Sequence, residues 1–78
     1  MANGIERPLD LLNNSRGKEI LVQLKNGKQM AGILKAFDIH VNIVLDNAKE
    51  IENEQQTKVY GLTFIRGDTI IFISPSTR

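Results

Sequence analysis

The chain of 78 residues contains no cysteine and no tryptophan, and it has only one histidine. Without cysteine, neither a disulfide nor a cysteine-based zinc site can stabilise so small a domain. A chain of this length forms one domain, here 1–78, and buries only about 60% of the surface that its unfolded form exposes. Its stability must therefore come from unusually good packing or from association with other copies.

Long hydrophobic runs and an imbalance of charge are absent as well. No stretch approaches the roughly 18 apolar residues of a membrane span, and the N-terminal residues do not have the profile of a signal peptide. We therefore expect a cytoplasmic protein. Ten Lys and Arg residues oppose nine Asp and Glu residues, so the formal net charge is +1. The overall charge does not indicate nucleic-acid binding, and a basic site must arise from local arrangement.

The first half of the sequence predicts a helix followed by two strands. Residues 1–4 carry no structural signal and are expected to fray. Pro8, three leucines and a polar end predict a short helix at about residues 8–15. Alternating apolar residues from position 18 predict a strand, and Asn26-Gly27 predicts a hairpin turn in which both residues have positive φ. The next strand covers 29–37, where a glycine at position 32 predicts a bend.

The second half of the sequence predicts three more strands. The third begins near Val41, with Val41, Ile43 and Leu45 on one side. The polar segment 46–57 is interpreted as a loop that extends two strands, and apolar runs at 58–65 and 69–74 complete the set. One helix and five strands predict an all-β fold, a small open barrel or strongly bent sheet.

The last two strands are apolar on both faces. In the final run, Ile70 and Phe72 lie on one face, and Ile71 and Ile73 lie on the other. Strands of this kind are usually buried on both faces, which a monomer of this size cannot easily achieve. Pairing with a neighbouring copy would resolve the problem, and a head-to-tail contact closes into a ring. The alternative is that the helix covers the second face.

Two polar groups stand out as candidates for function. Asp38, His40 and Asn42 alternate in FDIHVN, which would place their side chains on one side of an extended loop. The tight turn 66–68, Arg-Gly-Asp, separates two apolar strands. Its glycine permits positive φ and close approach of another molecule to the backbone.

These groups lie in two segments that resemble the motifs of one family. GILKAFDIHVNIVL (32–45) resembles the first Sm motif, and FIRGDTIIFI (64–73) resembles the second. The chain is thus similar to the Sm-like proteins, of the archaeal type, with the motif regions at about 18–51 and 58–75. The Arg-Gly-Asp turn differs from the Lys-His pair of the bacterial Hfq branch. Val41 stands where many members have methionine, and we expect this to affect packing rather than RNA contact.

The resemblance implies a fold, an assembly and a ligand. The fold is a short helix followed by a strongly bent five-stranded antiparallel sheet, and the subunits form a homoheptameric ring through their fourth and fifth strands. Single-stranded, uridine-rich RNA binds at the inner rim. By resemblance, His40, Asn42 and Arg66 contact the base, whereas no cofactor or metal is implied.

The chemistry of these residues suits that ligand. The His40 imidazole and the Arg66 guanidinium could stack on one base, which contributes roughly 1–3 kcal/mol. The Asn42 amide can donate to uracil O4 and accept from N3–H, but when flipped it would fit cytosine. Asp38 is an acceptor only, so we hypothesise that it holds the NH₂ end of that amide without touching RNA. The backbone at Gly67 and Asp68 could supply further hydrogen bonds, and the side chain of Asp68 could brace the turn.

Other interpretations remain open. Asp38 could simply form a turn, and His40 could make only a loop hydrogen bond. Most lysines, including Lys25, are expected to be solvated, and Arg7 with Lys18 could form an outer RNA contact. The chain could also be a protein-interaction module or a scaffold ring without base-specific RNA binding, although it lacks the several exposed aromatics of SH3-like domains. We expect no enzymatic activity, because no serine lies near the single histidine in sequence.

Overall fold

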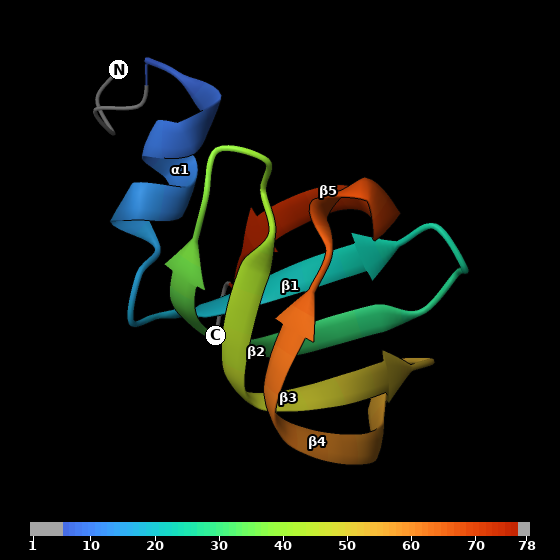
Figure 1. Cartoon of the computed structure of the whole chain (residues 1–78). Coiled ribbons are helices and arrows are strands. Elements are labelled where there is room, and N and C mark those ends of the chain that lie inside the picture. Colours follow the sequence, from blue (N-terminus) through green and yellow to red (C-terminus); the bar gives the residue numbers. More distant parts are fainter. Residues whose placement is uncertain (1–5, 77–78) are drawn as a thin grey trace.

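A short helix leads into five antiparallel strands that curl into a strongly bent sheet (Figure 1). The computed structural model describes residues 6–76, so the fraying predicted for residues 1–4 lies outside the described part. The elements are α1 (Pro8–Asn14), β1 (Glu19–Leu24), β2 (Gln29–Phe37), β3 (Ile43–Glu52), β4 (Gln55–Ile65), a 3₁₀ turn (Gly67–Thr69) and β5 (Ile70–Pro75). Among the described residues, no helix is long and apolar enough to cross a membrane.

Helix α1 is held at both ends by side chains. Pro8 occupies its first turn, where the missing N–H costs nothing. The carboxylate of Asp10 accepts hydrogen bonds from the backbone N–H groups of Glu6 (3.1 Å) and Arg7 (3.0 Å). At the other end, the Ser15 hydroxyl donates to the carbonyl of Leu11 at 2.8 Å. The helix therefore begins at Pro8 and ends at Asn14 after two turns, close to the prediction of 8–15.

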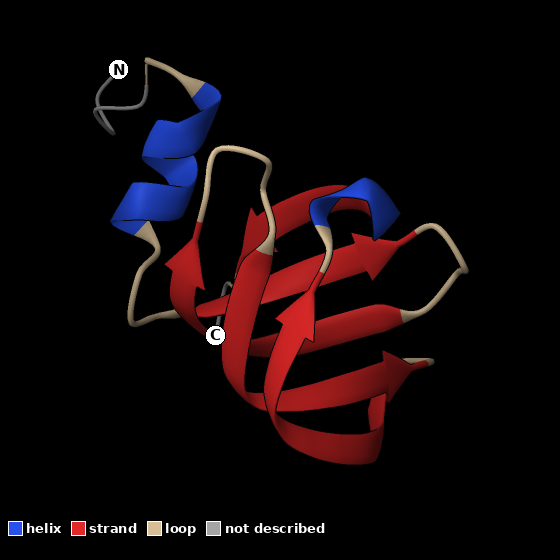
Figure 2. Ribbon diagram, in the orientation of Figure 1, coloured by secondary structure: helices blue, strands red, loops and turns tan. Residues whose placement is uncertain are grey.

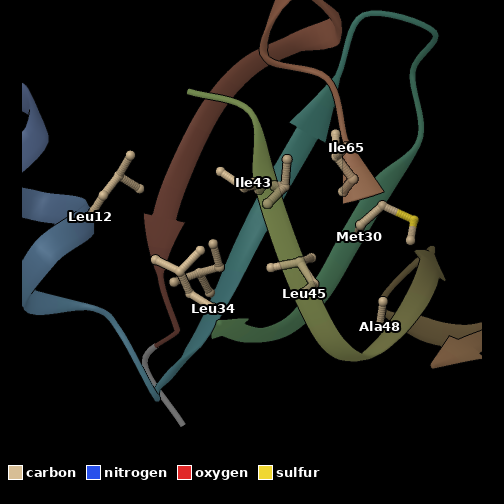
Figure 3. Packing of buried hydrophobic residues seen from close by; sticks show 9 residues of the cluster. Leu12, Met30, Leu34, Ile43, Leu45, Ala48 and Ile65 are labelled. Carbon is tan, nitrogen blue, oxygen red and sulfur yellow. The ribbon is translucent and has the colours of Figure 1, made fainter. Parts of the chain in front are cut away.

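The strands follow the order β4-β3-β2-β1-β5, so β4 and β5 lie at the two edges of the sheet (Figure 2). Alternate residues of the three central strands point into one core, whose largest fully buried side chains are Ile20, Val22, Leu34, Ile43 and Leu45. Leu12 of α1 is also buried and belongs to this cluster (Figure 3). Burial of a side chain of this type contributes about 1.5–3 kcal/mol, so these residues supply the main stabilisation of the subunit.

The predicted bend at Gly32 is confirmed. The pairing register between β2 and β3 shifts between Ala31 and Ile33, which is the signature of a bulge. A Cβ atom at position 32 would lie 3.0 Å from the carbonyl oxygen of Asp46 and 3.1 Å from the Cβ of Leu45. A side chain at position 32 would therefore crowd β3 where it approaches β2, and the bulge increases the local twist of the sheet.

The prediction for the β1–β2 turn was wrong in detail. In the β1–β2 turn only Gly27 has positive φ (91°), whereas Asn26 does not. The Asn26 side chain instead accepts a hydrogen bond from the Lys28 N–H at 2.9 Å. The arrangement is a wider turn with a glycine bulge, a common alternative to the two-residue hairpin.

The polar segment 46–57 extends two strands, as its interpretation allowed, and only the short turn between them is a loop. β3 continues to Glu52, and β4 begins at Gln55. A two-residue turn joins them, with φ of 54° at Asn53 and 65° at Glu54. β3 pairs with both β2 and β4 over this segment, and β4 pairs with β3, so the backbone is hydrogen-bonded within the sheet while polar side chains face solvent.

Both edges of the sheet present large apolar side chains to solvent. On β4, Leu62 is 70% exposed and Phe64 is 62% exposed, and on β5, Ile71 is 60% exposed. Within residues 6–76, α1 therefore does not cover the second face of these strands. Each subunit thus has two uncovered apolar edges, one on each side of the sheet.

Replacing Gly32 with valine tests the bend. The new side chain would collide with the β3 backbone, so we expect the free energy of unfolding to fall by about 1–3 kcal/mol. Urea unfolding at a fixed protein concentration measures it. Gly17→Asn is the control, since position 17 has positive φ (79°) with no neighbour within 4 Å, and asparagine tolerates that conformation. Equal effects of the two substitutions would show that the close approach at Gly32 does not limit stability.

Candidate functional site

Two turns that are distant in sequence meet at one end of the sheet (Figure 2). The first, residues 38–42, joins β2 to β3, and the second, residues 66–69, joins β4 to β5. The pairing of Ile43 with Ile65 at the start of β3 and the end of β4 brings the turns together. The candidate site is built at this junction.

The turn 38–42 is closed around the side chain of Asp38. One oxygen of this carboxylate accepts hydrogen bonds from the backbone N–H groups of His40 (2.9 Å) and Asn42 (3.1 Å). The Val41 N–H donates to the Asp38 carbonyl at 3.0 Å. Val41 itself has a φ of 63°, a left-handed conformation that is rare for a β-branched residue.

This conformation corrects the prediction of an extended loop. Val41 does not begin the third strand, which starts at Ile43, and the alternation of the polar residues does not arise from extended backbone. The reversal at Val41 instead turns the chain between His40 and Asn42. The sequence pattern could not reveal it, because valine is an unusual residue for positive φ.

The Asn42 side chain connects the two turns. Its Nδ2 donates to the second oxygen of Asp38 at 3.1 Å, and its Oδ1 accepts from the backbone N–H of Gly67 at 2.8 Å. The predicted contact between Asp38 and the NH₂ end of Asn42 is therefore present. One N–H of the amide and one lone pair of its oxygen are left for a ligand.

The Asn42 amide also keeps Asp38 ionised. The hydrogen bond from Asn42 is the largest cause of a lowered pKa of the Asp38 carboxyl, followed by those from the backbone of the turn, while desolvation acts in the opposite direction. The stabilisation that this carboxylate contributes is present above its ordinary pKa of 3.8 and is lost as the pH falls through the lower folded value. At neutral pH, Asp38 is thus an acceptor only.

Gly67 is required by the contact between the turns and not by positive φ. It is absent from the glycines with positive φ. A Cβ atom at this position would collide with the carbonyl oxygen of His40 and lie 2.9 Å from the carbonyl carbon of Val41. The Gly67 N–H donates to Asn42, so a hydrogen bond from the Gly67 backbone to a ligand stays a prediction that this N–H does not supply.

The rest of the second turn orients Arg66. Its guanidinium forms an ion pair with Asp68 at 2.8 Å, and both side chains are largely exposed. The Thr69 hydroxyl donates to the Arg66 carbonyl at 2.7 Å and closes the turn. Asp68 therefore holds the guanidinium, while the bracing expected of it is supplied by Thr69. A threonine directly after a predicted turn was the signal that could have revealed this role.

The two turns enclose a surface hollow of about 460 Å³. Its lining residues are His40, Asn42, Arg66, Gly67 and Asp68. These are the five predicted contact residues, while Asp38 does not line the hollow and is bonded to Asn42. The volume falls in the range of small-ligand pockets. Within residues 6–76, no three side chains of His, Cys, Asp or Glu gather as metal ligands. Arg7, the candidate for an outer contact, pairs with Asp10 at 3.3 Å.

The helix, the five-stranded bent sheet and the two linked turns define a small domain found in many known proteins. The LSM domain model matches residues 10–75. An Sm-like protein of Thermococcus sibiricus is 50% identical over 70 residues, which cover 90% of this chain and 92% of the relative. A second, from Methanosarcina barkeri, is 44% identical and covers 96% of this chain and all of the relative.

Solved structures agree with these sequence matches. The Sm protein of Pyrococcus abyssii in complex with a uridine heptamer superposes with a TM-score of 0.87 at 45% identity, covering 91% of this chain and 100% of the other. The P. aerophilum SmAP1 heptamer gives a TM-score of 0.85 at 35% identity, covering 95% and 99%. The chain belongs to the Sm-like (LSM domain) family.

Replacing Gly67 with alanine tests the junction of the turns. The added Cβ would push the second turn away from His40 and break the bond to Asn42, so we expect a loss of about 1–3 kcal/mol in the free energy of unfolding. Asp68→Ala is the control in the same turn, because an exposed ion pair contributes at most about 1 kcal/mol. Thermal and urea unfolding measure both variants. A loss for Gly67→Ala no larger than that for Asp68→Ala would contradict the close approach.

Proposed function

We propose that the chain forms a homoheptameric ring that binds uridine-rich, single-stranded RNA around its inner rim. The observation that carries this proposal is the Asn42 amide, which offers one donor and one acceptor to the hollow between His40 and Arg66. The solved relative in complex with a uridine heptamer supports the ligand. The heptameric relatives support the assembly.

The uncovered edges of the sheet support a ring. β4 of one subunit and β5 of the next both have unpaired backbone and exposed apolar side chains, so their pairing would extend the sheet from copy to copy. Because the two edges are different, the contact is head to tail, and such contacts close into rings. Burial of Leu62, Phe64 and Ile71 would then supply the stability that a lone subunit of this size lacks.

Each hollow would hold one base by stacking and by its edge. The imidazole of His40 and the guanidinium of Arg66 line the hollow and provide planar faces for an unpaired base. Asp68 limits the motion of the guanidinium through its ion pair. The backbone at Asp68 is a further candidate for a hydrogen bond to the base, while Gly67 acts by admitting the close contact of the turns.

The orientation of the Asn42 amide would select uracil over cytosine. A free N–H faces uracil O4 and a free lone pair faces N3–H, whereas cytosine needs the reverse. A flipped amide would place its NH₂ group against the Gly67 N–H and its oxygen against the Asp38 carboxylate. Both contacts would be repulsive, so Asp38 and the Gly67 backbone together hold the orientation that reads uracil.

One hollow binds weakly, but a ring repeats it. When one nucleotide is bound, the next is held near the adjacent hollow, which raises its effective concentration. The ring also gathers one Arg66 from each subunit, so that local convergence of charge replaces overall basicity.

We propose a role in RNA processing or metabolism, as a binding protein and not an enzyme, with residues 1–78 forming one domain. We place this activity in the cytoplasm.

Fluorescence anisotropy with labelled RNA tests the function. We expect a U-run to bind more tightly than a C-run or an A-run, each about ten nucleotides long so that several hollows are filled. Asn42→Ala should remove most of the preference for the U-run, because it removes the group that reads the base edge. Equal binding of all three runs by the wild-type protein would leave only a stacking surface. No binding would favour the scaffold ring.

Replacing Asp38 with asparagine tests the orientation of the amide. An asparagine oxygen can still accept from the backbone of His40 and Asn42, which use one carboxylate oxygen, but an NH₂ group now faces the Asn42 Nδ2. We expect the preference for uracil over cytosine to fall by about two- to tenfold, the effect of one hydrogen bond, while U-run affinity falls less.

Asp38→Ala serves as the comparison for this variant. It removes the backbone contacts as well, so it should weaken binding to every base and lower stability. Competition anisotropy with U-run and C-run RNA gives the ratio for both variants. If Asp38→Asn weakens binding to the two runs by the same factor, the orientation argument is wrong.

A further inference from the structure

A second hollow adjoins the base site and is lined by a further basic side chain, that of Lys25. It has a volume of about 430 Å³ and shares Arg66 and Asp68 with the base site. Lys25 and Asn26 of the β1–β2 turn form the rest of its polar rim, next to Thr69. Its apolar lining residues include Phe64, which lies on the β4 edge of the sheet.

We propose that the polar rim of this hollow holds a phosphodiester group of the bound RNA, with Lys25 as the positively charged contact. The inference rests on the proposed function, because it places the backbone of the strand whose bases enter the adjoining hollow. A base in the first hollow is joined through its ribose to phosphates that must pass nearby. Contacts to phosphate fix the register of a strand without reading its sequence.

The position of Lys25 relative to the base site is determined by the backbone. Its N–H donates to the carbonyl of Thr69 at 2.8 Å, and the neighbouring Leu24 pairs with Ile70 at the start of β5. The β1–β2 turn is thereby attached to the turn that presents Arg66. Lys25 is thus held beside the base site and does not sit on an independent loop.

The charges near the hollow leave Lys25 uncompensated. The guanidinium of Arg66 is already held in an exposed ion pair with Asp68. Among the described residues, the basic side chains without an ion pair or aromatic partner are Arg16, Lys18, Lys25 and Lys35. Of these four, Lys25 is the one that lines a hollow shared with base-site residues. A phosphate that follows a bound base would therefore meet Lys25 as the available positive charge.

Lys25→Gln, compared with Lys35→Gln, tests this assignment on the intact ring. Lys35 is also exposed and unpaired in the described part of the chain, but it lies on β2 and lines neither hollow. U-run and C-run affinities are measured by anisotropy between about 50 and 200 mM salt, where phosphate contacts dominate the slope. Ring size is measured in parallel by light scattering.

We expect Lys25→Gln to weaken binding of both runs by about three- to tenfold at low salt. The slope of log affinity against log salt should fall by about 0.7 for each phosphate that the variant no longer neutralises. The ratio of U-run to C-run affinity should not change, and neither should ring size. Lys35→Gln should keep the wild-type slope.

Several results would overturn the assignment. A wild-type slope for Lys25→Gln, or the same reduction for Lys35→Gln, would mean that Lys25 is not a specific phosphate contact. A changed U-to-C ratio would place Lys25 at the base instead. A smaller ring would assign the whole hollow to the neighbouring subunit. If the wild-type protein binds the U-run and these results follow, only this inference fails, whereas absence of U-run binding removes the proposed function itself.

Discussion

The bridge made by the Asn42 amide is the interaction on which the rest of the site depends. Among residues 6–76, it is the one side chain that bonds to both turns, to the Asp38 carboxylate on one side and to the Gly67 backbone on the other. Through it, the turn that carries His40 and the turn that carries Arg66 become one rigid unit. The same two bonds that build the junction also determine which donor and which acceptor of the amide remain free, so the proposed base selection would have the same cause as the architecture.

The bend of the sheet makes this bridge possible. Gly32 allows β3 to approach β2 closely, and the resulting curvature carries β4 and its following turn across the end of the core. The chain can then return as β5 on the far side of β1, which leaves β4 and β5 as opposite edges. The curvature that forms the site also places the two uncovered apolar edges, β4 and β5, on opposite sides of the sheet. In a ring, assembly and ligand binding would therefore both depend on the bulges that bend the sheet.

Electrostatics in this small domain is local rather than global. The net charge is close to zero, and several basic groups are already paired, such as Lys49 with Glu19 at 3.1 Å and Lys28 with Glu50 at 3.9 Å. The ion pair of Arg66 with Asp68 orients a planar cation more than it adds charge. An unpaired lysine beside such a site would contribute more to the binding of a negatively charged ligand than the net charge of the chain suggests. Repetition around a ring would multiply each of these local effects.

The sequence by itself determined the order of elements, the extent of β2, the bend at Gly32 and the set of residues that line the hollow, because hydrophobic period, glycine placement and paired motifs are local signals. Only the tertiary structure decided how those residues meet. The positive φ of Val41, the Gly67 N–H that holds Asn42 and the attachment of Lys25 to Thr69 depend on contacts between segments far apart in the chain. Polar composition left open whether 46–57 was a loop or an extension of two strands, and the pairing of β3 with β2 and β4 decided it. Local propensity is weak against such long-range contacts, and a folded site is made of them.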